Sequence, residues 1–245
     1  MELSAVVTAG GRVSGEFAQA LGTPVKALAP YAGTTFLHAG IEALRGAGIR
    51  RIAVVGGGEV RRACEHLVEN VIDESHDGAE NLRRALHAWD SRAPLLYLTS
   101  DMPFITAASL RSFLERVPDD ALALPLTEYA TFAQRFPDAP PFGITLAGEK
   151  VVNGGAFVIP AHGHERIETF AARFFDARKS AWRMARLTGP RLLLQFLFRR
   201  LSIDGLERHA NRLLGLRALA VREAPPELAY DVDVLEEYAY AVARS

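Results

Sequence analysis

Cysteine is almost absent from this sequence, which holds Cys64 and no second cysteine among its 245 residues. A single cysteine cannot form an internal disulfide, so the fold cannot depend on a disulfide framework. The first residues, MELSAVVTAGG, lack the basic region and long apolar region of a secretory signal. We therefore expect a cytoplasmic protein.

Long apolar runs are lacking as well. The longest strongly apolar stretch covers residues 192–198 and is interrupted by Gln195, whereas a transmembrane helix needs roughly 20 apolar residues. This predicts that no segment spans a membrane. Arg191 and Arg199 flank the stretch, which is compatible with binding to an anionic membrane surface, but we interpret it as a core helix with basic ends.

Two kinds of binding motif are missing. Of the seven histidines only His162 and His164 form a close pair, and they lack cysteine or acidic partners at zinc-ligand spacing. This argues against a structural zinc site. The GxGxxG fingerprint of dinucleotide-binding Rossmann domains is also absent, which argues against a site for NAD-type cofactors.

The overall composition is that of a folded protein. Hydrophobic residues make up 49% and charged residues 23% of the chain, close to the average for globular proteins. A chain of this length forms one large or two small domains, at roughly 100–200 residues each. Because the sequence shows no linker or repeat, we predict one domain over residues 1–245.

Charge is distributed unevenly, although the net charge is only −1. Residues 166–222 carry 13 Lys and Arg against 4 Asp and Glu, a net +9, which leaves 15 basic and 25 acidic residues, a net −10, elsewhere. A basic stretch of this kind suits an anionic substrate, a phospholipid surface or nucleic acid. It is equally compatible with the solvated face of ordinary helices.

Strand-like and helix-like patterns alternate along the first half of the chain. The apolar periodicity predicts strands at 3–8, 51–56 and 94–99 and helices at 36–47, 79–89 and 107–117. Buried strands that alternate with helices indicate a mostly parallel sheet covered on both faces, which is a doubly wound α/β fold.

The second half of the chain predicts two further features. Strand-like runs at 121–125, 142–146 and 156–159, with a turn at Gly148-Glu149, indicate an antiparallel edge. Residues 164–215 have a nearly continuous helical pattern, with Ser202 and Asp204 as candidate caps. We predict that they form a helical insertion, followed by a strand at 217–222 and a helix at about 234–244.

Glycine-rich or polar residues follow the three strands predicted in the first half, as Ala9-Gly10-Gly11, Gly56-Gly57-Gly58 and Ser100-Asp101. In doubly wound sheets, ligands bind at the carboxyl ends of the strands. A glycine turn at such a strand end exposes backbone N–H donors to phosphate. These three segments therefore predict a ligand site at one edge of the sheet.

Two places in the sequence offer carboxylates to a divalent metal. Asp101 follows a buried strand, is stiffened by Pro103, and lies six residues before Ala107, which is too far to cap the next helix. Asp231 and Asp233 project to the same side of an extended segment, because side chains alternate there. One carboxylate from each place would form a site of hard oxygen ligands, although each acid alone is also compatible with a cap or a solvated turn.

The order of these motifs resembles that of MobA-like nucleotidyltransferases, most strongly over the first 115 residues. The resemblance is carried by Ala9-Gly10-Gly11, Lys26-Ala27-Leu28, Gly33, residues 47–56, Gly78, Asn81-Leu82, residues 96–106, residues 153–157 and residues 231–238. It implies a GT-A-like, Rossmann-like fold. It also implies Mg²⁺-dependent transfer of a nucleoside monophosphate from an NTP to a phosphorylated small-molecule acceptor, with release of pyrophosphate and no nucleic-acid partner.

The resemblance further implies roles for individual residues. The Gly10 and Gly11 amides and the Lys26 ammonium would bind the triphosphate, Lys26 and Asp101 would act in catalysis, and Asp101 and Asp231 would hold Mg²⁺. The nucleotide site would also include Ala9, Arg12, Gly56, Asn81 and Ser100. We expect the acceptor to contact Asn153, Gly154, Gly155, Arg178 and Lys179, the last two from the basic stretch.

Two alternative functions remain open from the sequence. A GT-A glycosyltransferase would share the nucleotide half, but it commonly carries an Asp-x-Asp motif where this chain has Asp101-Met102-Pro103. A non-catalytic nucleotide-binding regulator is suggested by the glycine loop, where the family arginine is replaced by Gly15 and the nearby arginine is Arg12. The long helical stretch and Arg135-Phe136-Pro137 resemble a less characterised branch of the family.

Overall fold

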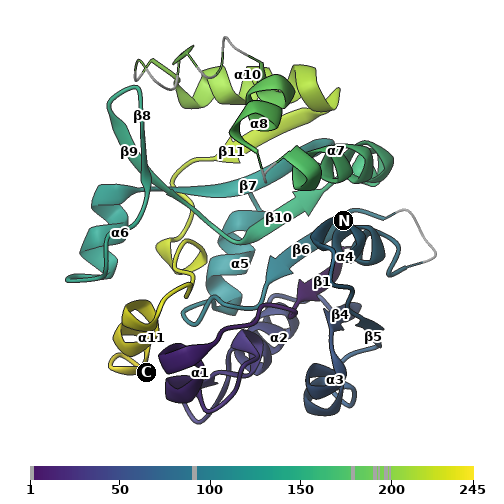
Figure 1. Ribbon diagram of the computed structural model, residues 1–245, viewed down its shortest axis with the longest axis vertical. Helices are drawn as coiled ribbons and strands as arrows, with labels where there is room; N and C mark the ends of the chain where they lie inside the picture. Colours follow the sequence, from purple (N-terminus) through teal and green to yellow (C-terminus); the bar gives the residue numbers. More distant parts are fainter. Residues whose placement is uncertain are drawn as a thin grey trace.

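Strands and helices alternate along the first half of the chain, and helices dominate residues 164–214 (Figure 1). The computed structural model describes residues 3–89, 93–177, 180–189, 192, 194–195, 198 and 200–245. The helices are α1 (Gly15–Leu21), α2 (Phe36–Gly46), α3 (Gly58–Cys64), α4 (Gly78–Leu86), α5 (Ala107–Leu114), α6 (Tyr129–Arg135), α7 (His164–Ala177), α8 (Ala181–Thr188), α10 (Ile203–Leu214) and α11 (Leu235–Val242), with 3-10 turns η1 (Lys26–Leu28), η2 (Ala161–Gly163) and η3 (Pro226–Leu228). The strands are β1 (Ser4–Thr8), β2 (Pro30–Tyr31), β3 (Thr34–Thr35), β4 (Ile52–Gly56), β5 (Asn70–Asp73), β6 (Leu95–Thr99), β7 (Ala121–Glu128), β8 (Ile144–Leu146), β9 (Glu149–Asn153), β10 (Ala156–Ile159) and β11 (Arg217–Val221).

Nine of the described strands form one sheet, in the order β5-β4-β1-β6-β10-β7-β9-β8 with β11 beside β7. β5, β4, β1 and β6 are parallel to one another, and β11 is parallel to β7. β9 pairs antiparallel with both β7 and β8. The predicted mostly parallel sheet with an antiparallel edge is confirmed. One antiparallel strand, β10, lies inside the sheet between β6 and β7, a position the sequence did not predict.

Helices cover both faces of the sheet (Figure 1). On one face Ile41 of α2 and Phe113 of α5 belong to the same buried cluster as alternate side chains of β1 and β4. On the other face Leu86 of α4 and Ile167 of α7 pack with Val6 of β1. Because β1 buries its side chains in both directions, its sequence is continuously apolar.

Side-chain caps set the starts of the predicted helices. The Thr35 hydroxyl caps α2, the Asp77 carboxylate caps α4, and Thr106 and Ser109 form a capping box at the start of α5. Asp101 is therefore not needed as a cap, in agreement with its distance from α5.

Several short elements were not predicted from the sequence. They are α1, α3, β5, α6 and β9, each of four to seven residues. Helices of this length are unstable alone and form because tertiary packing holds them. For example, Phe132 of α6 is 1% exposed within a cluster of aromatic side chains.

The helical pattern predicted after His164 corresponds to α7, α8 and α10, and the Ser202 hydroxyl caps α10 by accepting from the Gly205 N–H. The interpretation of 192–198 as a core helix is wrong for two of its residues, since Leu194 is 51% and Phe198 69% exposed. Within the described part of the chain, no helix is long and apolar enough to cross a membrane.

Candidate nucleotide and metal site

The glycine-rich and polar segments meet at one edge of the sheet. Thr8, the last residue of β1, is in register with Val55 of β4 and Thr99 of β6. The segments that start at Ala9, Gly56 and Ser100 therefore leave the sheet side by side. This is the carboxyl edge of the parallel strands, where doubly wound sheets bind their ligands.

Lys26 is held against the glycine turn by the backbone. Its N–H donates to the Gly11 carbonyl oxygen at 2.9 Å, and an isolated bridge joins Arg12 and Val25. A Cβ on Gly11 would lie 3.4 Å from Lys26 Cε, so a larger residue at Gly11 would crowd the lysine side chain. The glycine turn and η1 thus place backbone donors and an ammonium group next to each other.

The Lys26 ammonium connects two of the predicted acidic segments. Its Nζ lies 2.6 Å from Asp101 Oδ2 and 2.6 Å from Asp233 Oδ1. Burial lowers the pKa of Lys26, but the Asp101 and Asp233 carboxylates raise it by more, so the pKa lies above its usual value. The side chains of Lys26 and Asp101 are 13% and 15% exposed, whereas Asp233 is 67% exposed.

The segment that carries Asp231 is fastened beside Asp101. The Val232 N–H donates to the Asp101 carbonyl oxygen at 3.0 Å. Tyr230 and Val232 are both 0% exposed, and alternation turns the side chains of Asp231 and Asp233 the other way. Burial, followed by the nearby Asp101 and Asp233 carboxylates, raises the pKa of Asp231 to about 7. The pairing of distant carboxylates that the sequence suggested is thus present in the structure.

Glu237 fixes the end of the same segment. Its Oε2 accepts from the Asp233 N–H at 2.6 Å and from the Val234 N–H at 3.0 Å. The Tyr230 hydroxyl in turn donates to the Glu237 carbonyl oxygen at 3.0 Å. The start of α11 therefore positions the acidic segment through both side chain and backbone.

Arg12 does not point to a free anion site. Its Nη2 lies 2.9 Å from Glu74 Oε1 and 3.6 Å from Glu59 Oε2. Glu74 covers the glycines, since a Cβ on Gly10 would lie 2.2 Å from Glu74 Oε2 and one on Gly57 would lie 2.7 Å from Glu74 Oε1. A triphosphate on the glycine turn would have to draw Arg12 from these carboxylates.

Asn81 and Ser100 occupy supporting positions. Asn81 Oδ1 accepts from the Ser75 N–H at 2.6 Å and Asn81 Nδ2 donates to the Ser75 carbonyl oxygen at 2.9 Å. The amide that was expected near the nucleoside thus shapes the loop between β5 and α4. Ser100 is 8% exposed and directly precedes Asp101.

The predicted acceptor loop lies against β6. The Gly155 carbonyl oxygen accepts from the Thr99 N–H at 3.0 Å, and a Cβ on Gly155 would lie 2.2 Å from Thr99 Oγ1. A Cβ on Gly154 would lie 2.2 Å from the Leu228 carbonyl oxygen. Glycine is therefore required for close packing at both positions. Asn153 lines a neighbouring cavity, and Arg178 and Lys179 lie outside the described residues.

The carboxylates fit a divalent cation that is completed by substrate. Among the described residues no three His, Cys, Asp or Glu side chains form a ready-made metal site. Mg²⁺ commonly binds one or two carboxylates together with substrate phosphates, which matches Asp101 and Asp231. Asp101 Oδ1 is buried and has no hydrogen-bond partner within the described part of the chain, so it is available to a cation.

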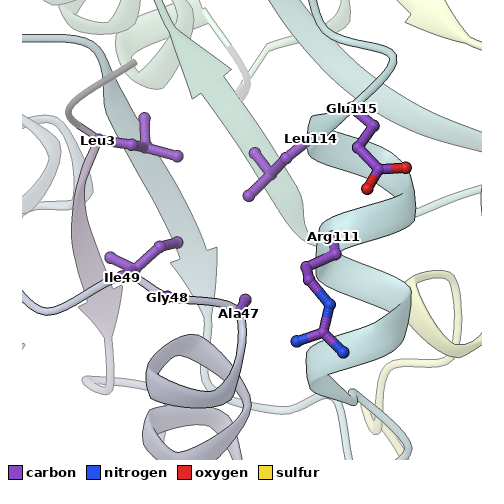
Figure 2. Close-up of a pocket in the computed structure, with 7 residues that line it drawn as sticks. All are labelled: Leu3, Ala47, Gly48, Ile49, Arg111, Leu114 and Glu115. Atoms are coloured by element: carbon purple, nitrogen blue, oxygen red, sulfur yellow. The ribbon is translucent and has the colours of Figure 1, made fainter.

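One cavity lies at the opposite edge of the sheet. It is lined by Leu3 before β1, Ile49 before β4, and Arg111 and Leu114 of α5, and it has a volume of about 300 Å³ (Figure 2). It lies at the amino ends of β1 and β4, and the glycine turn lies at the opposite, carboxyl edge of the sheet. We do not assign it to the candidate site.

The sequence did not lead us to Glu59, to Glu74 or to the contact of Asp233 with Lys26. A signal for Glu74 exists in the sequence, because it lies two residues after the apolar Val71-Ile72 pair and directly after the end of β5, while Asp101 lies two residues after the end of β6. β5 was not predicted, so this strand-end acid was not recognised.

Comparisons with known proteins show the family and the fold. The MobA-like NTP transferase domain matches residues 5–199, and no curated protein matches the chain. A solved hypothetical transferase from Thermus thermophilus is 30% identical over 97% of this chain and 99% of its own, with a TM-score of 0.84.

Two more distant solved structures share the fold. The manganese complex of Rv0371c from Mycobacterium tuberculosis is 20% identical over 100% of both chains, with a TM-score of 0.55. A CTP:phosphocholine cytidylyltransferase from Streptococcus pneumoniae is 11% identical over 100% of this chain and 99% of its own, with a TM-score of 0.59. With the domain match over most of its length, this chain belongs to the MobA-like NTP transferase domain family and is an enzyme of the nucleotidyltransferase type.

Proposed function

We propose that this enzyme transfers a nucleoside monophosphate from an NTP to a phosphorylated small molecule and releases pyrophosphate, with Mg²⁺ as its cation. The observation that carries the proposal is the Lys26 ammonium, which lies 2.6 Å from both Asp101 and Asp233 beside the glycine turn. An ammonium, backbone donors and acidic side chains are the groups that a metal-bound triphosphate requires.

The chemistry needs little covalent help from the protein. A phosphate oxygen of the acceptor attacks the α-phosphorus, the bond between the α-phosphorus and its bridging oxygen to the β-phosphorus breaks, and pyrophosphate leaves. The attacking oxygen is already an anion, so no general base is required. The protein contributes position and charge: Gly10 and Gly11 present N–H groups, and Lys26 neutralises phosphate oxygens.

Asp101 and Asp231 are the residues that would hold the cation. Both carry hard oxygen ligands, and burial, together with the nearby Asp101 and Asp233 carboxylates, raises the pKa of Asp231 to about 7. When bound, the cation supplies positive charge to the α-phosphate. Asp101 and Asp231 then orient it, while Lys26 is freed to contact phosphate.

The solved relatives support the substrate class. Similar folds have been solved with manganese and with CTP, the latter in a CMP-2-keto-3-deoxy-manno-octonic acid synthetase. Those ligands belong to those proteins, which share the fold of this chain.

The test is a screen for pyrophosphate release. Each of the four NTPs is supplied with Mg²⁺ or Mn²⁺ and with sugar phosphates, phosphopolyols, phospho-pterins or phospholipid precursors. We expect release with one NTP and one acceptor class, and its loss when the cation is removed by a chelator. Release that continues without any divalent cation would contradict the metal assignment. Absence of release across the panel would contradict the transferase assignment.

A further inference from the structure

An apolar cavity lies on the face of the sheet that α7 covers. Its volume is about 320 Å³, and its lining includes Tyr97 of β6, Phe157 of β10, Phe174 of α7 and Leu214 of α10. Tyr97 and Phe157 meet edge to face, with ring centroids 6.2 Å apart. The catalytic scheme above uses none of these side chains.

A second apolar cavity shares the lining residue Phe157 with the first. Its volume is about 260 Å³, and it is lined by Leu126 of β7, Leu146 of β8, Phe157 of β10 and Ala210 of α10. Phe157 and α10 contribute to both cavities, so we describe the two together as the apolar trough. Ligand pockets span roughly 300–1,000 Å³ and are mostly apolar, a range that the trough reaches.

The apolar trough approaches the candidate site near the ends of β9 and β6. Asn153 lines it, and two residues later Gly155 lies against Thr99, the residue that ends β6. Tyr97, which lines the first cavity, also lies near the site. Burial raises the pKa of its hydroxyl, a hydrogen bond to Thr8 lowers that pKa, and the nearby Asp101 carboxylate raises it. The metal-binding edge and the apolar trough are therefore neighbours.

Helix α7, which lines the apolar trough, and helix α8, which packs against α7, carry cations that suit an anionic lipid. Arg173 of α7 and Arg186 of α8 form no ion pair within the described part of the chain, and Arg173 lies beside Phe170 and Leu214 of the trough lining. Trp182 of α8 is 79% exposed, and tryptophan next to arginine is typical of surfaces that contact lipid headgroups.

We propose that the phosphorylated acceptor is a lipid, with its phosphate at the Asn153–Gly155 loop and Asp101 and its hydrocarbon chain in the apolar trough. This inference rests on the proposed nucleotidyl transfer and narrows its acceptor class. The product would be a nucleoside diphosphate linked to the lipid. A water-soluble sugar phosphate does not match the trough, because its hydroxyl groups would lose their hydrogen bonds to water and find no partners among the apolar side chains.

A series of alkyl phosphates tests the inference. Butyl, hexyl, octyl and decyl phosphate are compared as acceptors by pyrophosphate release, and as ligands of the nucleotide-free enzyme by calorimetry. We expect affinity to rise about two- to fourfold per added methylene. Glycerol 3-phosphate serves as the short polar comparison.

Two leucine variants on α7 make the test specific. Ala171 is 5% exposed and lines the apolar trough, whereas its neighbour Ala172 is exposed. Ala171→Leu should fill the trough and weaken octyl phosphate at least tenfold, with little change for butyl phosphate or the NTP. Ala172→Leu should behave as wild type. Ala210→Leu fills the second cavity, and gives a separate reading if Ala171→Leu unfolds at lower temperature.

The outcomes separate the two proposals. If pyrophosphate is released equally from butyl, octyl and glycerol phosphates, nucleotidyl transfer holds and the lipid acceptor is overturned. If affinity rises with chain length in calorimetry and falls in Ala171→Leu, the trough binds the hydrocarbon even when no pyrophosphate appears, and the transfer reaction is then what fails. Equal binding of all chain lengths by wild type and Ala171→Leu overturns the inference directly.

Discussion

The glycine-turn edge and the apolar trough lie next to each other on one sheet, but they differ in chemistry. At the edge, the Lys26 Nζ lies 2.6 Å from a carboxylate oxygen of Asp101 and 2.6 Å from one of Asp233, so opposite charges are packed closely together. The trough presents aromatic and aliphatic side chains from β6, β10, α7 and α10. Under the proposed function, the edge would stabilise phosphate charge and the trough would select the acceptor by shape and apolar area. Variants at the edge should therefore affect the rate most, and variants around the trough should affect acceptor choice.

The largest effect is expected at Asp101. Asp101→Ala should lower kcat/KM by about 10²–10³-fold, because it removes a group on which transition-state charge stabilisation depends. The measurement is pyrophosphate release over a range of Mg²⁺ concentrations. Asp119→Ala, on an exposed loop, is the matched control. Equal activity in the two variants would end the metal assignment of Asp101.

The next largest effect is expected at Lys26. Lys26→Ala should lower kcat/KM for the NTP by about 10- to 100-fold. It should also lower the free energy of unfolding by about 1–2 kcal/mol, since Asp101 loses its cation while Asp233 remains screened by water. Divalent cations should raise the melting temperature of the variant more than that of wild type. Lys150→Ala, on β9, controls for loss of a lysine. Unchanged pyrophosphate release with normal unfolding would remove Lys26 from the site.

The basic stretch supplies the next test. Arg178→Ala combined with Lys179→Ala should lower acceptor affinity about tenfold, because charge-assisted contacts to phosphate are strong. Affinity for the NTP, measured by calorimetry at two salt concentrations, should stay the same. Equal losses for both ligands would assign the pair to the triphosphate, and no loss would return it to an ordinary solvated surface.

The smallest effect is expected at Arg12. Arg12→Ala should raise the KM for the NTP about three- to tenfold, since the arginine must leave Glu59 and Glu74 before it can contact phosphate. Exposed Arg62 on α3 provides the control as Arg62→Ala. An unchanged KM in Arg12→Ala would mean that Arg12 serves only to hold the two glutamates, and that no arginine replaces the family residue missing at Gly15.

Much of the site could be predicted because strand ends can be recognised locally. Ala9-Gly10-Gly11 and Ser100-Asp101 follow apolar runs that only a buried strand explains, so their meeting at one edge follows from a parallel sheet. Glu74 could not be placed in this way, because β5 is short and was not recognised. The exposure of Leu194 and Phe198 was also misjudged, since an apolar run does not reveal whether another element covers it.

Aromatic residues show the same limit of local patterns. Arg135-Phe136-Pro137 resembles a motif of a less characterised branch of the family. In the structure, Phe136 and Pro137 contact Tyr230 and Tyr240, and Tyr240 lies 103 positions after Pro137 in the sequence. Phe136 is 1% exposed in the aromatic cluster around Tyr230, and the Pro137 carbonyl oxygen accepts from the Tyr240 hydroxyl at 2.7 Å. The motif therefore helps to support the segment that carries Asp231.

The sequence by itself determined the alternation of strands and helices, the Ser202 cap of α10 and the glycine turn, because each depends on neighbours a few residues away. The tertiary structure decided which distant groups meet. Lys26 contacts Asp233, which lies 207 positions later in the sequence. Phe157 lines the apolar trough together with side chains of α7 and α10. Such contacts depend on the order of strands in the sheet. The strand at 156–159 was predicted from its apolar pattern, but that pattern does not show that β10 inserts antiparallel between β6 and β7.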